Sequence, residues 1–71
     1  MSKQDQRSPV ELAIADSVFQ AGRCQYLPLT EDAQAELSCL CDRHIEHSDG
    51  EHEYRGTTED GDEWIVLLEV T

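Results

Sequence analysis

The pattern of apolar and polar positions predicts a helix near the start of the chain. In Ser8-Pro9-Val10-Glu11 the serine can cap a helix, proline suits the first helical position, and glutamate can reach back to the cap amide. Apolar residues then recur at helical spacing, with Val10, Ile14, Val18 and Ala21 as the stripe, widened by Leu12, Ala15 and Phe19. The predicted polar side consists of Asp16, Ser17 and Gln20. Gly22 predicts the stop, and so broad a stripe is typical of a helix that contacts several elements.

A second helix is predicted from its cap, Thr30, to about Ile45. Glu31 and Asp32 lie at its N-terminus, where the helix dipole favours negative charge. Its predicted inward stripe is Ala33, Leu37, Leu40, Cys41 and His44. Residues 23–29, with Pro28, are predicted to be a connector, and residues 48–50 a loop.

The last third of the chain predicts a β-hairpin, with strands at 51–58 and 62–70 around Glu59-Asp60-Gly61. A two-residue turn would pair Tyr54 with Leu67, whereas a three-residue loop would pair Tyr54 with Val66. We choose the second register because it gathers the large apolar residues on one face: Tyr54, Trp64, Val66, Leu68 and Val70. Ile65 and Leu67 then point to the other face and are our candidates for self-association.

Together these elements predict an α+β fold, with two helices followed by a β-hairpin (ααββ) and the helices packed on one face of a small antiparallel sheet. We expect a flexible leader at residues 1–7 and one small domain at 8–71. A two-stranded sheet with apolar residues on both faces is not stable by itself, so we expect either edge pairing with a second copy, as a homodimer through the hairpin, or a cover on the second face.

Charge is distributed unevenly along this sequence. Residues 1–30 carry three acids and three bases, whereas residues 31–71 carry thirteen acids and two bases, so the second part holds the whole net charge of −11. Such a field repels nucleic acid and anionic membranes and attracts cationic surfaces. The polar N-terminus does not resemble a secretory signal, and no apolar run is long enough to span a membrane. The number of cysteines is odd, which argues against a disulfide framework. These features predict a cytoplasmic protein with reduced thiols.

Cysteine and histidine cluster between residues 39 and 52, which suggests a zinc module as an alternative. Its candidate ligands are Cys41, His44, His47 and His52, with Cys24 and Cys39 as substitutes. The spacing lacks the paired ligands of recognisable zinc sites, and Cys39 would point away from Cys41 on a helix. We therefore predict no metal or cofactor. We also predict no enzyme, because the hairpin acids lie where solvent reaches them and catalytic carboxylates need a partly desolvated cleft.

The remaining feature is the display of carboxylates, which predicts a non-enzymatic protein that binds a basic protein surface. A rigid acidic surface can imitate spaced phosphates and compete with nucleic acid for a nucleic-acid-binding protein. The candidate contact residues are Glu31, Asp32, Glu36, Asp42, Glu46, Glu59, Asp60, Asp62 and Glu63. In size and charge the chain resembles the small acidic proteins with which phages and mobile elements block host nucleases, polymerases or defence complexes. A further alternative is that the acidity only provides solubility in a salt-rich cytoplasm.

Overall fold

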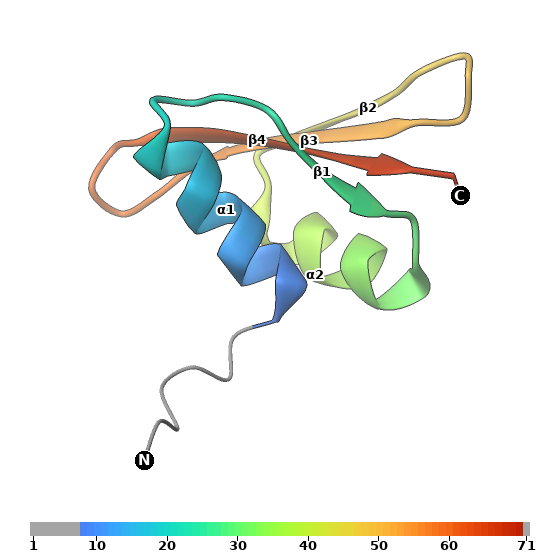
Figure 1. Ribbon diagram of the computed structural model, residues 1–71, viewed down its shortest axis with the longest axis horizontal. Helices are drawn as coiled ribbons and strands as arrows, with labels where there is room; N and C mark the ends of the chain where they lie inside the picture. The colour runs from blue at the N-terminus through green and yellow to red at the C-terminus, as the bar shows by residue number, and fades with distance from the viewer. Residues whose placement is uncertain (1–7, 71) are drawn as a thin grey trace.

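The computed structural model describes residues 8–70, and these residues form two helices and one four-stranded sheet (Figure 1). In chain order the elements are α1 (Pro9–Phe19), β1 (Gln25–Pro28), α2 (Glu31–Leu40), β2 (Arg43–Glu46), β3 (His52–Thr57) and β4 (Glu63–Glu69). The strand order in the sheet is β1-β4-β3-β2, with β1 parallel to β4 and the other pairs antiparallel. Both helices lie on the same face of the sheet (Figure 1). The α+β class is confirmed, but the ααββ order and the purely antiparallel sheet are wrong.

Helix α1 begins as predicted and ends earlier than predicted. The Ser8 hydroxyl accepts a hydrogen bond from the Glu11 amide at 3.1 Å, and the Glu11 carboxylate accepts one from the Ser8 amide at 3.4 Å. The same hydroxyl donates to the Glu36 carboxylate at 2.7 Å, which fastens the start of α1 to α2. The helix stops at Phe19, and the chain turns through two left-handed residues, Ala21 (φ 60°) and Gly22 (φ 86°).

Helix α2 is shorter than predicted, because the residues after it join the sheet. Thr30 caps it as expected and accepts a hydrogen bond from the Ala33 amide at 3.1 Å. The helix ends at Leu40, Cys41 is extended (φ −83°, ψ 158°), and the Asp42 amide donates to the Arg55 carbonyl at 2.7 Å. Cys41, Asp42, His44 and Ile45 are weaker helix formers than leucine or alanine, and strand β2 (Arg43–Glu46) pairs its backbone along the otherwise open edge of β3.

The predicted connector before α2 is also a strand. Gln25 pairs with Val66 at the start of β1, and the Leu29 amide donates to the Glu69 carbonyl at 2.8 Å just after its end. Pro28 is tolerated because β1 is an edge strand. With β1 along β4 and β2 along β3, both edges of the hairpin are paired within the chain.

The hairpin has the register that the sequence predicts. Tyr54 lies opposite Val66 and Gly56 opposite Trp64. Gly56 is needed here because the indole ring of Trp64 lies over it, and a Cβ atom at this position would overlap the ring. Gly61 in the connecting loop has a φ of +91°, which glycine adopts without strain.

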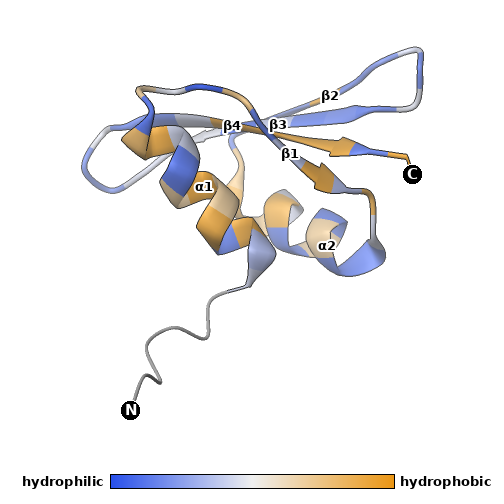
Figure 2. Ribbon diagram, in the orientation of Figure 1, coloured by the Kyte–Doolittle hydropathy of each residue, from blue (hydrophilic) through white to orange (hydrophobic). Residues whose placement is uncertain are grey.

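The core lies between the helices and the inner face of the sheet. Its buried members are Val10, Ala13, Ala33, Leu37, Tyr54, Trp64, Val66 and Leu68. Figure 2 shows apolar residues on both helices and along β4, and mostly polar residues in the loops at the two ends of the sheet. The buried side of α1 is rotated from the prediction: Ser17 is fully buried, whereas Phe19 is 88% exposed.

Candidate functional site

The predicted contact carboxylates are almost all accessible to solvent. Glu36 is half-buried, because its carboxylate accepts the hydrogen bond from Ser8. The others are exposed: Glu31, Asp32, Asp42, Glu46, Glu59, Asp60, Asp62 and Glu63. A partner could therefore reach every member of the predicted set except Glu36 without rearrangement of the fold.

The fold does not bring these carboxylates together on one face. The β3–β4 loop lies at one end of the sheet, whereas the start of α2 and the β2–β3 turn lie at the other end (Figure 1). We call the acids of the loop and the first residue of β4 the loop carboxylates: Glu59, Asp60, Asp62 and Glu63. We call the acids around the β2–β3 turn and the last residue of β4 the turn carboxylates: Glu46, Asp49, Glu51 and Glu69. A partner that binds one end therefore leaves the carboxylates of the other end in solvent.

Backbone hydrogen bonds hold the β3–β4 loop in a defined shape. The Thr58 amide donates to the Asp62 carbonyl at 2.8 Å, and the Gly61 amide donates to the Thr58 carbonyl at 2.9 Å. The Thr58 hydroxyl also accepts from the Asp62 amide at 3.1 Å. None of the loop carboxylates forms an ion pair with another residue of the 8–70 segment. The loop backbone is therefore held in place, and its exposed carboxylates have no neutralising partners in that segment.

Beside this loop runs a groove of about 700 Å³, which we call the acidic groove. It is lined by residues of α1, by the β3–β4 loop with the end of β3, and by Leu40 and Trp64. Its apolar lining residues are Ile14, Ala15, Val18, Phe19, Leu40 and Trp64. Its charged lining residues are all acidic: Glu11, Glu59, Asp60 and Asp62. The acidic groove thus combines an apolar surface with charged residues that are all negative.

Sequence reasoning missed the acidic groove because it placed Phe19 and Leu40 in the core. In the structure Phe19 is 88% and Leu40 47% exposed. Isolated apolar residues on a surface are common, but two that line the same groove mark a candidate contact surface. The one signal in the sequence was the breadth of the α1 stripe, which indicated a second contact for this helix.

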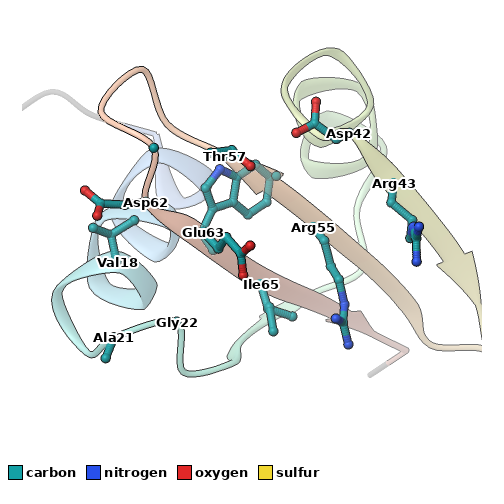
Figure 3. Close-up of a pocket in the computed structure, with 13 residues that line it drawn as sticks. Val18, Ala21, Gly22, Asp42, Arg43, Arg55, Thr57, Asp62, Glu63 and Ile65 are labelled. Atoms are coloured by element: carbon teal, nitrogen blue, oxygen red, sulfur yellow. The ribbon is translucent and has the colours of Figure 1, made fainter.

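A second hollow, of about 580 Å³, shares four lining residues with the acidic groove: Val18, Thr57, Asp62 and Trp64 (Figure 3). Both bases of residues 31–71, Arg43 and Arg55, line it beside three acids, Asp42, Asp62 and Glu63. These two bases are directly paired across β2 and β3. Because acids and bases mix here, this hollow offers a cationic partner less net charge than the acidic groove does.

The sheet face opposite the helices carries the predicted self-association pair. Ile65 is half-buried and Leu67 is 9% exposed, so Leu67 has little free surface to offer a second copy. On the same face Glu53 is 8% exposed and receives hydrogen bonds from Arg55 and, at 2.8 Å, from the His47 ring. Its pKa is lowered, mainly by the hydrogen bond from Arg55, although burial acts in the opposite direction.

The residues proposed as alternative zinc ligands lie on opposite faces of the sheet. His44 and His52 lie on the helix side of the sheet, where their rings stack against Tyr54 and share a hydrogen bond of 2.9 Å. His47 contacts Glu53 on the opposite face, since side chains alternate along a strand. Cys41 caps the end of α2. Within residues 8–70 no three histidine, cysteine or acidic side chains gather in a way that could hold a metal ion.

The cysteines are free thiols in the structure. Cys39 is exposed, whereas Cys24 and Cys41 are half-buried. Burial raises the pKa of Cys24, and the negative charges of Glu53 and Glu51 act in the same direction. Because the thiolate is the nucleophile, this environment lowers the reactivity of Cys24.

Searches against family models, curated proteins and solved structures returned no match to this chain. The helices in the described part of the chain are 11 and 10 residues long, and neither meets the length and apolarity needed to cross a bilayer.

Proposed function

We propose that this protein is a non-enzymatic interaction protein that binds a basic surface of another protein through the β3–β4 loop. The observation that carries the proposal is the exposed position of the loop carboxylates, three of which line an apolar groove and none of which forms an ion pair inside residues 8–70. Charges that are already neutralised internally offer a partner little, whereas unpaired charges of one sign steer a basic partner to the site.

The proposal favours one end of the molecule over the other. Three of the loop carboxylates, Glu59, Asp60 and Asp62, line the acidic groove together with exposed apolar residues, and a few anchor residues, aromatic ones among them, supply most of the affinity of protein interfaces. Glu31 and Asp32 instead lie at the N-terminus of α2, where they stabilise the helix dipole and so have a role in the fold. The preferred partner is a nucleic-acid-binding protein, because its basic surface already accommodates a row of negative charges.

A pair of variants with equal net charge tests this function. The loop variant carries Glu59→Gln, Asp60→Asn, Asp62→Asn and Glu63→Gln. The turn variant carries Glu46→Gln, Asp49→Asn, Glu51→Gln and Glu69→Gln. Each loses four carboxylates, which changes the net charge from −11 to −7. The immobilised wild-type protein is used to capture partners at low salt, and the purified partner is titrated with all three proteins.

The proposal predicts that the loop variant binds the purified partner at least about tenfold more weakly than the turn variant does. It also predicts that the wild-type protein displaces labelled duplex DNA from that partner, and that the loop variant does so poorly. Equal loss of binding in both variants would show that net charge alone is responsible, and would contradict the assignment to the β3–β4 loop.

A second candidate role for the acidic residues is adaptation to high salt, and one specific observation favours it. Acidic residues occupy both ends of the sheet as well as the start of α2, and no single binding site needs such a distribution (Figure 1). A negative surface spread in this way keeps a protein soluble and monomeric. The two candidates differ in what salt should do to stability and to binding.

A further inference from the structure

We infer that the acidic groove seats an amphipathic, positively charged helix of the partner protein. This inference rests on the proposed function and adds the chemistry of the bound segment. The partner helix would place apolar side chains on the apolar lining of the groove and lysine or arginine side chains beside its carboxylates.

The lining of the acidic groove fits a helix rather than a strand. A strand binds by adding to a free sheet edge, but the backbone beside the groove is already paired. β3 and β4 bond to each other along the hairpin, and in the loop the Thr58 amide donates to the Asp62 carbonyl at 2.8 Å. What the groove offers instead is a surface of side chains, which is the surface that a helix in a groove uses.

The dimensions also suit a helix. The stripe of α1 that lines the groove runs from Glu11 to Phe19, which corresponds to about 12 Å along the helix axis at 1.5 Å per residue. Two turns of a partner helix span nearly the same length and present anchors at positions i, i+3 or i+4, and i+7. Phe19, 88% exposed at the end of the stripe, is the largest apolar surface available to such anchors.

Charge complementarity decides which helix can bind. Every ionisable residue that lines the acidic groove is an acid, so the groove attracts lysine and arginine. A second copy of this chain is disfavoured, because it carries a net charge of −11 and would bring further carboxylates against the same walls. An anionic membrane is disfavoured for the same reason.

The chain contains its own reporter for this binding. Trp64 is the one tryptophan in the sequence, it is 3% exposed, and it lines the acidic groove. A helix that enters the groove therefore changes the environment of the indole ring, and tryptophan fluorescence follows the titration. The probe is a synthetic peptide of about 18 residues without tryptophan, long enough to form a helix, with leucine on one face and lysine on the other.

Two comparisons make the test specific. A scrambled peptide with the same residues has the same charge but no apolar face. Phe19→Ser removes the anchor surface of the groove, whereas Leu12→Ser alters another exposed apolar residue of α1 that does not line it. Far-UV circular dichroism of each variant shows that the fold is retained.

We expect the amphipathic peptide to bind with a change in Trp64 emission, and the scrambled peptide to bind at least about tenfold more weakly. We expect Phe19→Ser to weaken binding of the amphipathic peptide by about tenfold, and Leu12→Ser to have little effect. If both peptides bind equally and Phe19→Ser has no effect, the helix site is wrong but binding of basic partners stands. If neither peptide binds at low salt, the proposed function fails as well.

Discussion

At the scale of single residues, Ser17 connects two distant parts of the chain. Its side chain is fully buried, and its hydroxyl accepts the Ile65 amide at 3.0 Å. Pairing between β1 and β4 begins one residue later, at Val66, so Ser17 completes the ladder where β1 does not reach. The sequence pattern assigned Ser17 to the solvent side of α1, because a serine in a helix gives no sign of a partner 48 residues away.

Replacing Ser17 with alanine is expected to lower the free energy of unfolding by about 1–3 kcal/mol, because the Ile65 amide then loses its partner in a partly buried position. Urea denaturation followed by circular dichroism measures this change. Ser48→Ala, in an exposed loop, is the control and should change stability by less than about 0.5 kcal/mol. A loss as small as that for Ser17→Ala would show that the hydrogen bond is unimportant.

Glu53 makes stability depend on acid pH. The hydrogen bond from Arg55 lowers its pKa, so the folded state favours the ionised form more than the unfolded chain does. This contribution is complete above the pKa of an unfolded glutamate, about 4.3, and is lost as the pH falls from there through the folded-state pKa. Glu51 acts in the opposite direction, because burial together with Asp49 and Glu69 raises its pKa.

We therefore expect Glu53→Gln to reduce the loss of stability below about pH 4.5, relative to the wild-type protein. The measurement is a series of urea unfolding curves between about pH 3 and pH 7. Glu59→Gln, at an exposed loop position, should leave the wild-type pH profile nearly unchanged. If the two variants give the same profile, the Arg55 hydrogen bond does not account for the acid dependence.

At the scale of elements, the parts of the fold that depend on neighbouring residues were predictable. The capping box of α1 uses residues three positions apart, and the hairpin register follows from which face collects Tyr54, Trp64 and Val66. The end of α2 was not predictable from such patterns. Leu37, Leu40, Cys41 and His44 keep a helical spacing, but β3 offers an open edge that residues 43–46 complete.

The hairpin provides a test of element pairing at Gly56. Glycine usually weakens a strand, so alanine would normally stabilise this position slightly. Here a Cβ atom would overlap the Trp64 ring, and we expect Gly56→Ala to cost about 1–3 kcal/mol of unfolding free energy. Thr57→Ala, at the exposed neighbouring position, is the control in the same thermal and urea unfolding measurements. A more stable Gly56→Ala protein would contradict this packing.

At the scale of the whole molecule, the sequence predicted the charge of the candidate site but not its shape. The loop carboxylates were identified because charge can be counted along the chain. The acidic groove could not be identified from the sequence, because α1 and the β3–β4 loop are far apart in the sequence and meet only in the fold. Phe19 was assigned to the core for the same reason: helical spacing indicates an apolar face but not what covers it.

The charge of the whole molecule also predicts how salt affects stability. At a net charge of −11 the folded chain repels itself, and salt reduces this repulsion because the screening length falls from about 10 Å at 0.1 M to about 3 Å at 1 M. We expect the melting temperature of the wild-type protein to rise with sodium chloride. The loop and turn variants, both at −7, should each show a smaller rise, because each has four fewer negative charges to repel one another.

Partner binding should respond to salt in the opposite direction, since screening weakens attraction between the loop carboxylates and a basic surface. If the acidity serves binding, we expect the wild-type protein to be folded at about 0.1 M salt and to bind its partner more tightly there than at higher salt. Of the two variants, only the loop variant should bind more weakly than the wild-type protein. Thermal unfolding and titration of the purified partner over the same salt series measure both quantities. A chain that folds only near 1 M salt would be adapted to salt, and its acidity would then need no partner to explain it.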